Sequence, residues 1–177
     1  MTGRTSLQFG CATLLSVLLL GATPGLLQAQ GSPEPAPPFV VKTFEGRVLR
    51  LSELKGRPVV LDFWATWCRP CRAAMPHLDE VQKRFSGRGL IVIGLSVDDD
   101  GTSDVKRFAH DLGVNFPLGM ANEKVLDNYG PIRSLPTTYF ISRDGAVVRR
   151  VKGYIDPETL DSYVLELVQA GHASGGR

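Results

Sequence analysis

Two apolar runs, residues 58–64 and 90–97, constrain the fold of this chain more than any other feature. Runs of this length, rich in valine, isoleucine and leucine, are typical of strands buried on both faces of a sheet. A helical pattern follows each run. Two further strands, at 137–142 and 146–152, flank an Asp-Gly turn signal and precede an amphipathic helix. This order predicts an α/β fold with a central mixed β-sheet flanked by helices.

The boundaries of the domain follow from composition. Residues 39–42 and 47–51 alternate around a Glu-Gly turn and predict a leading β-hairpin. We predict one domain over residues 39–170, which is long enough to bury a core of ordinary size. The stretch 30–38, QGSPEPAPP, predicts a flexible lead-in, and residues 171–177 a flexible tail.

The first 29 residues have the pattern of a secretory signal peptide. Arg4 is their only charge, an apolar run spans residues 11–22, and Ala29 places a small residue at the point of cleavage. The alternative is an uncleaved membrane anchor over residues 11–27, although the run is shorter than the ~20 residues that a spanning helix needs. We therefore expect a periplasmic or otherwise exported protein, with membrane anchoring as the alternative.

Removal of that segment takes Cys11 with it and leaves two cysteines, Cys68 and Cys71. Exported proteins occupy compartments where disulfides form and persist. A disulfide between these two would close a very short loop, so it would stabilise the fold little by constraining the unfolded chain. We therefore interpret the pair as reactive rather than structural.

The surroundings of the pair favour a thiolate. Cys68 and Cys71 lie where the strand 58–64 gives way to a helix, whose N-terminus carries partial positive charge and free N–H groups. Arg69 adds a full positive charge, and Pro70 suits the first helical turn. Cys-x-x-C pairs in this setting have a lowered thiol pKa. We predict Cys68 as the nucleophile and Cys71 as the resolving thiol.

Asp62 places a carboxyl group inside the first apolar run. Burial disfavours an ionised carboxylate, so its pKa should rise towards the range that is useful for proton transfer. We predict that Asp62 is the base that deprotonates Cys71. The alternative is an aspartate that faces solvent at the edge of the strand.

The string VVLDFWATWCRPC, with Pro76 five residues beyond the second cysteine, resembles the thioredoxin superfamily, and most of all its exported TlpA/ResA-like branch. The likeness runs from about Phe39 to Leu167. It includes the leading hairpin and an inserted helix–strand segment near residues 113–130. The resemblance implies a thioredoxin fold.

The resemblance also implies roles for single residues. Pro136 matches the cis-proline that lies against the cysteine pair, Leu135 would pair its backbone with the substrate, and Trp67 would pack beside the site. Branch members commonly carry a glutamate three residues after the second cysteine, where this chain has Ala74. We infer that Asp62 acts alone here, and the substrate choice associated with that glutamate is not implied.

These features predict a thiol–disulfide oxidoreductase that exchanges the Cys68–Cys71 dithiol or disulfide with disulfides of exported client proteins. By resemblance we expect a reductase, for example in cytochrome c maturation, that is re-reduced by a membrane-bound electron donor. We expect no cofactor and no metal. A net charge of +2, with both signs interspersed, does not favour a nucleic-acid partner.

Four alternative functions involve the same residues or the same fold. Zinc or copper bound by Cys68, Cys71 and His77 would lack a second ligand pair at structural spacing. The acidic stretch 98–101 lacks the closing glutamate of a calcium loop and predicts a solvated turn. Peroxidase chemistry would by resemblance need a threonine where this chain has Ala65. A non-catalytic client-binding or metal-delivery module on the same fold is the remaining alternative.

Overall fold

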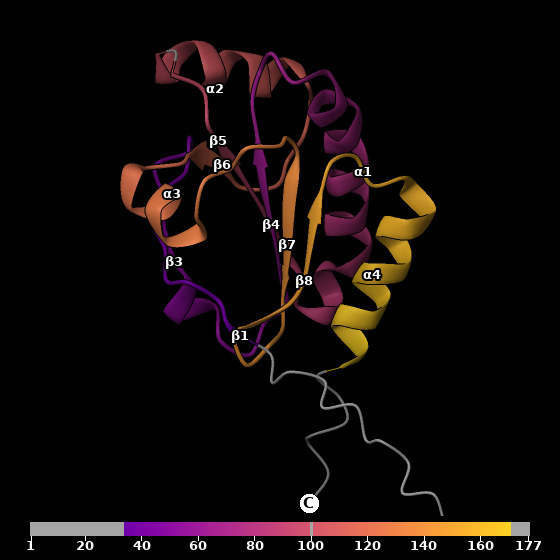
Figure 1. Ribbon diagram of the computed structural model, residues 1–177. Coiled ribbons are helices and arrows are strands. Elements are labelled where there is room, and N and C mark those ends of the chain that lie inside the picture. Colours follow the sequence, from indigo (N-terminus) through magenta and orange to yellow (C-terminus); the bar gives the residue numbers. More distant parts are fainter. Residues whose placement is uncertain (1–33, 100, 171–177) are drawn as a thin grey trace, which may run out of the picture. The chain divides into compact units, whose positions relative to one another are not determined.

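The computed structural model describes residues 34–99 and 101–170, all within the compact unit Ser32–Arg177. The predicted thioredoxin fold is confirmed: a six-stranded mixed sheet has the order β1-β8-β7-β4-β5-β6 (Figure 1). Its strands are β1 (Glu34–Pro35), β4 (Val59–Trp64), β5 (Ile91–Ser96), β6 (Leu118–Met120), β7 (Thr137–Ile141) and β8 (Ala146–Lys152). The helices are α1 (Arg69–Phe85), α2 (Thr102–Asp111), α3 (Glu123–Tyr129) and α4 (Pro157–Gln169), with short 3-10 turns η1 (Leu51–Leu54) and η2 (Ser86–Arg88).

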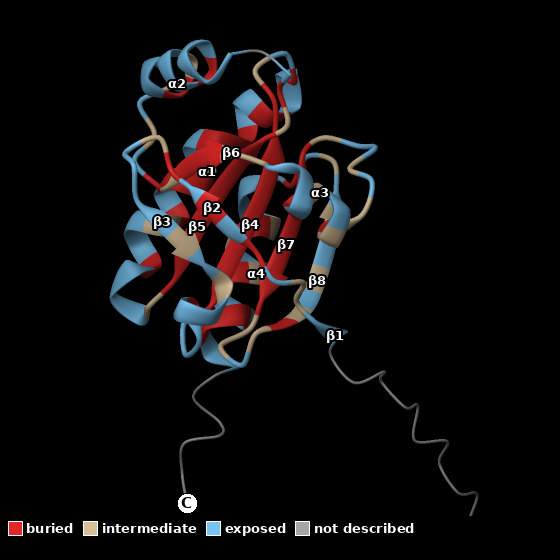
Figure 2. Cartoon of the chain, turned by 90° about the vertical axis from the view of Figure 1, so that its left-hand side faces the viewer, coloured by how far each residue is buried: buried red, intermediate tan, exposed pale blue. Residues whose placement is uncertain are grey.

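The centre of the sheet is the part that the apolar runs predict. β4 pairs parallel with β5 and antiparallel with β7, and every residue of β4, β5 and β7 is buried (Figure 2). Burial on both faces explains why these strands lack an alternating polar pattern. The sheet is mixed because two kinds of connection build it. Helices α1 and α2 connect β4, β5 and β6, which are parallel, whereas β7 and β8 form an antiparallel hairpin.

Two apolar cores cover the two faces of the sheet. On one face α1, α2 and α4 pack over residues such as Val60 and Trp64. On the other face α3 and the leading hairpin cover Phe63, which meets Tyr129 and Tyr139 at ring-centroid distances of 5.5 and 5.9 Å. Figures 1 and 2 show α3 on the opposite side of the sheet from α1 and α4. These cores hold the end of β4, and the cysteines that follow it, in place.

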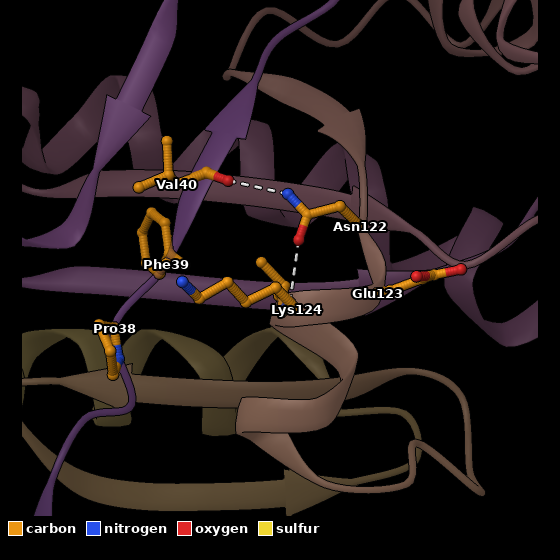
Figure 3. Close-up of a pocket in the computed structure, with 7 residues that line it drawn as sticks. Pro38, Phe39, Val40, Asn122, Glu123 and Lys124 are labelled. Carbon is orange, nitrogen blue, oxygen red and sulfur yellow. Dashed lines mark hydrogen bonds between the residues drawn. The ribbon is translucent and has the colours of Figure 1, made fainter.

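The predicted leading hairpin is present as β2 (Val40–Lys42) paired antiparallel with β3 (Val48–Arg50). It is tied to α3 by Asn122, whose amide donates to the Val40 carbonyl at 2.9 Å while its side-chain oxygen caps the helix at the Val125 N–H (Figure 3). A pocket of about 580 Å³ opens between the hairpin and the start of α3.

Within the inserted segment near residues 113–130, strand β6 begins only at Leu118 and ends at Met120. The reason is a contact with α1: the Asn115 N–H donates to the Asp79 carboxylate at 2.7 Å, and Gly113 turns the chain with φ 68°. Both interactions keep this segment out of the ladder until Leu118.

The lead-in 30–38 was predicted to be flexible, but its described residues 34–38 form hydrogen bonds with the domain. Glu34 and Pro35 form β1 against β8, and the carbonyls of Pro37 and Pro38 accept hydrogen bonds from the side chains of α3 at 2.8 and 2.7 Å. Pro37 and Pro38 are therefore fixed by partners that lie about 90 residues further along the chain, and Glu34 and Pro35 by Ala146 and Val147 of β8. The signal segment 1–29, residues 30–33 and the tail 171–177 lie outside the described residues. Among the described helices, none is long and apolar enough to cross a membrane.

Candidate active site

Cys68 and Cys71 form a disulfide at the junction between β4 and α1, with an S–S distance of 2.01 Å and a Cα–Cα distance of 5.3 Å. Cys68 is the N-cap of α1, and its Sγ accepts a hydrogen bond from the Cys71 backbone N–H at 3.2 Å. The helix therefore directs an N–H group and its positive end at the sulfur of Cys68. A thiolate at this position would be stabilised by both.

The two sulfurs differ in access to solvent. Cys68 is 4% exposed and Cys71 is fully buried, whereas Trp67 is 69% exposed. Cys68, the predicted nucleophile, is the more accessible of the two sulfur-bearing residues, although most of it is covered. Pro70 lies in the first turn of α1, as predicted from the sequence, and Arg69 precedes it; both residues are exposed.

Asp62 lies in the middle of β4 and is 1% exposed. Its register partner on β7 is Thr138, whose hydroxyl donates to Asp62 Oδ1 at 2.7 Å. Burial raises the pKa of Asp62 to about 7, against the opposing effect of the Thr138 hydrogen bond. The alternative of a solvent-facing aspartate at the strand edge is wrong.

Asp62 differs from the other buried carboxylates of the described residues, Asp79 and Asp98. Asp79 pairs with Lys83 at 2.6 Å, and Asp98 accepts several hydrogen bonds, whereas Asp62 Oδ2 has no partner among the described groups. A carboxylate with one unpartnered oxygen and a pKa of about 7 is suited to accept a proton near neutral pH. Ala74, at the position of the family glutamate, is a buried residue of α1 and adds no ionisable group.

The loop before β7 carries Leu135 and Pro136, the other residues predicted for the site. The Leu135–Pro136 peptide bond is cis, as the resemblance implied. The Pro136 carbonyl accepts a hydrogen bond from the Gly153 N–H at 2.7 Å, while the Leu135 backbone makes no hydrogen bond with any described residue. Thr137 follows directly and pairs with Phe63 on β4, so this loop lies beside the strand that carries Asp62.

Sequence reasoning missed the role of Asp98. Residues 98–101 were expected to form a solvated turn, but Asp98 is only 7% exposed. Its carboxylate accepts hydrogen bonds from the Thr66 N–H at 3.0 Å, the Thr66 hydroxyl at 2.6 Å and the Ser96 hydroxyl at 2.6 Å. It thereby fixes the turn that leads from β4 to Cys68. No local sequence pattern marks this contact, because only the parallel pairing of Trp64 with Ser96 brings residues 66 and 98 together.

The fold and the disulfide at the N-terminus of α1 define a thioredoxin-fold thiol–disulfide oxidoreductase. The chain belongs to the AhpC/TSA family, whose model matches residues 33–150.

Three comparisons support this class. The chain is 36% identical over 133 residues to the thiol-disulfide oxidoreductase ResA of Bacillus thuringiensis (strain Al Hakam). The matched residues cover 75% of this chain and 76% of that protein. It is also 36% identical over 141 residues to the ResA of Bacillus subtilis (strain 168), covering 79% and 77%. A thiol:disulfide interchange protein of the thioredoxin family from Chlorobium tepidum TLS superposes with a TM-score of 0.72 at 30% identity, covering 79% of this chain and 99% of that one.

Proposed function

We propose that this protein reduces disulfides of exported client proteins through Cys68 and Cys71. The observation that carries the proposal is the hydrogen bond from the Cys71 N–H to Cys68 Sγ at the start of α1. In the reduced protein this bond would favour the thiolate of Cys68, which is the attacking species in disulfide exchange.

The reaction has two steps. The Cys68 thiolate attacks one sulfur of the client disulfide, the client S–S bond breaks, and the released client thiolate takes a proton from water. Cys71 then loses its proton to Asp62 and attacks Cys68 Sγ. The mixed disulfide breaks, the second client thiolate leaves and is protonated, and the Cys68–Cys71 disulfide remains. Two electrons pass from the protein to the client.

Asp62 is the base of the second step in this proposal. Its unpartnered Oδ2 and its raised pKa support proton transfer from a buried thiol. Leu135 would hold the client chain through its free backbone groups, and Trp67 would cover the exposed side of the mixed disulfide. The positive charge of Arg69 would assist the thiolate of Cys68.

We further propose that the protein acts outside the cytoplasm and takes its electrons from a membrane-bound donor. The signal pattern of residues 1–29 supports export. The proposed direction of electron flow rests on resemblance, because reducing members of the superfamily have a proline at the position of Pro70. By the same resemblance, cytochrome c maturation is a candidate process. Arg69 acts in the opposite direction, because stabilising the reduced form makes a pair more oxidising.

The reduction potential tests this proposal directly. The protein is equilibrated with graded mixtures of a thiol and its disulfide, and the redox state of Cys68 and Cys71 is measured by alkylation. A value near or below about −270 mV supports a reductase, whereas a value near about −120 mV would make the protein a disulfide donor. Absence of any reversible two-electron couple would contradict exchange through this pair.

Two variants sharpen the measurement. Arg69→Gln should shift the potential to more negative values, because the thiolate loses its nearest cation. Arg72→Gln is the matched control, since Arg72 also lies on the first turns of α1 but stacks its guanidinium over Phe108 at 5.5 Å. Cys68→Ser should abolish exchange altogether. A Cys68→Ser variant that still reduced clients would show that another group carries the reaction.

A further inference from the structure

A basic groove lies beside the cis-proline loop. It has a volume of about 260 Å³, and its lining includes Arg133 from the loop before Pro136 together with Arg150 and Lys152 from β8. All three cationic residues are exposed, and none of them forms an ion pair with a carboxylate of the described residues.

The neighbouring Arg149 shows that this lack of partners is specific to one face of β8. Arg149 pairs with Glu166 of α4 at 3.0 Å. Arg150 points to the other face, where its guanidinium lies 4.9 Å from the ring centroid of Tyr139. This contact holds the cation over the sheet without neutralising it.

Protection of a sheet edge does not explain the whole arrangement. Lysine and arginine on an edge strand discourage pairing with other chains, and that role alone could account for Arg150 and Lys152. Among the described residues, β1 pairs only with Ala146 and Val147, so the rest of β8 forms an open edge of the sheet, and Figure 2 shows exposed residues along it. Arg133, however, belongs to a different segment and lines the same groove. Three cations from two segments around one hollow indicate a binding site for negative charge.

The position of the groove identifies what would carry that charge. Ser134 and Thr137 belong to the lining and flank Leu135–Pro136 in the chain. A client segment that pairs with the free backbone of Leu135 advances about 3.3 Å per residue. Client residues that follow the one paired with Leu135 would therefore pass over the groove that Arg133 and Arg150 line.

We infer that this groove binds aspartate or glutamate side chains next to the client disulfide, so that the enzyme prefers disulfides with acidic flanks. The inference rests on the proposed function, because it takes the client to lie along Leu135. Opposite charges on the two surfaces speed encounter and set register, and exposed pairs of this kind are screened by salt.

The test uses three synthetic peptides with the same disulfide and with acidic, neutral or basic flanking residues. Each is mixed with the reduced protein at low and high salt, and the second-order rate of exchange is measured. Rates are divided by those with 2-mercaptoethanol, which carries no charge besides that of its attacking thiolate, to remove differences in intrinsic reactivity. At low salt we expect the acidic peptide to react about three- to thirty-fold faster than the basic one, and salt should remove most of this preference.

Two variants with equal loss of charge separate the groove from the general field of the protein. Replacement of Arg133, Arg150 and Lys152 by glutamine should bring the acidic-to-basic rate ratio close to one. Replacement of Lys42, Arg47 and Lys55 by glutamine should leave the ratio unchanged. These three cations are exposed and belong to the hairpin and η1 region. Arg150→Glu combined with Lys152→Glu should reverse the preference towards the basic peptide.

The outcomes that overturn the inference are distinct. Equal rates for all peptides, or an equal loss of preference in both triple variants, would show that the groove does not select the client. In both cases the neutral peptide is still reduced, so the proposed function stands. If no peptide is reduced by the wild-type protein, the proposed function fails, and the inference fails with it.

Discussion

Thr138 and Asp62 face each other across β7 and β4, and the Thr138 hydroxyl donates to Asp62 Oδ1 at 2.7 Å while Oδ2 has no partner among the described residues. One oxygen is thus held and the other is free to take a proton. The carboxyl group is buried, so its charged form is disfavoured and its pKa rises to about 7. The same arrangement has consequences for stability and for the rate of exchange.

Asp62 should make the protein less stable as the pH rises. The native pKa of about 7 lies above the ordinary value of 3.8. Between these values the unfolded state has lost the proton that the native state retains, so the contribution of Asp62 to stability is complete below pH 3.8 and falls as the pH rises towards 7. The full loss is of the order of 4 kcal/mol. Urea denaturation of wild type and Asp62→Asn from pH 4 to pH 8 should show the asparagine variant gaining relative stability across that range.

A second substitution checks the cause. Thr138→Val removes the hydrogen bond that lowers the native pKa of Asp62, so the pH-dependent loss should extend to higher pH and become larger. Parallel stability curves for wild type and Asp62→Asn would contradict burial as the origin of the shift.

Asp62→Asn should slow release of the client from the mixed disulfide more than the initial attack. Asparagine keeps an acceptor for Thr138 but cannot take the proton of Cys71, and loss of a general base typically costs on the order of 10²-fold. Rapid acid quenching of a reaction with a peptide disulfide should therefore show the mixed disulfide accumulating in the variant. Equal slowing of both steps would refute this role.

The parts of the fold that local patterns determine were predictable. The apolar runs 58–64 and 90–97 predicted the buried strands β4 and β5. Asp62 could be expected to be buried because its neighbours on the strand are apolar. Asp98 could not, since an acidic residue after a strand has the same pattern whether it faces water or a partner. Its burial depends on Thr66, which only the parallel pairing brings near.

Asp98→Asn should destabilise the turn before Cys68. The carboxylate accepts hydrogen bonds from Thr66 and Ser96, and an amide would set its own N–H groups against one of these donors. A buried donor left without an acceptor costs about 1–3 kcal/mol, so we expect a loss of about 2 kcal/mol in the free energy of unfolding. Asp99→Asn is the control, because Asp99 is exposed and should change stability by less than about 0.5 kcal/mol. Equal effects of the two substitutions would show that the Thr66 contacts are not stabilising.

Gly119→Ala should loosen the attachment of the leading hairpin to the sheet. A Cβ atom at Gly119 would lie 2.6 Å from the Lys42 carbonyl oxygen, and this glycine forms the bridge between β6 and Thr43. Because the obstacle is backbone, the hairpin must shift, and we expect a loss of about 1–3 kcal/mol in the free energy of unfolding. Gly87→Ala is the matched control, since a Cβ there meets nothing within 4 Å. Hydrogen exchange should show faster exchange in β2 and β3 of Gly119→Ala with β4 and β5 unchanged. If β4 and β5 lost protection to the same extent, the hairpin would instead unfold together with the centre of the sheet.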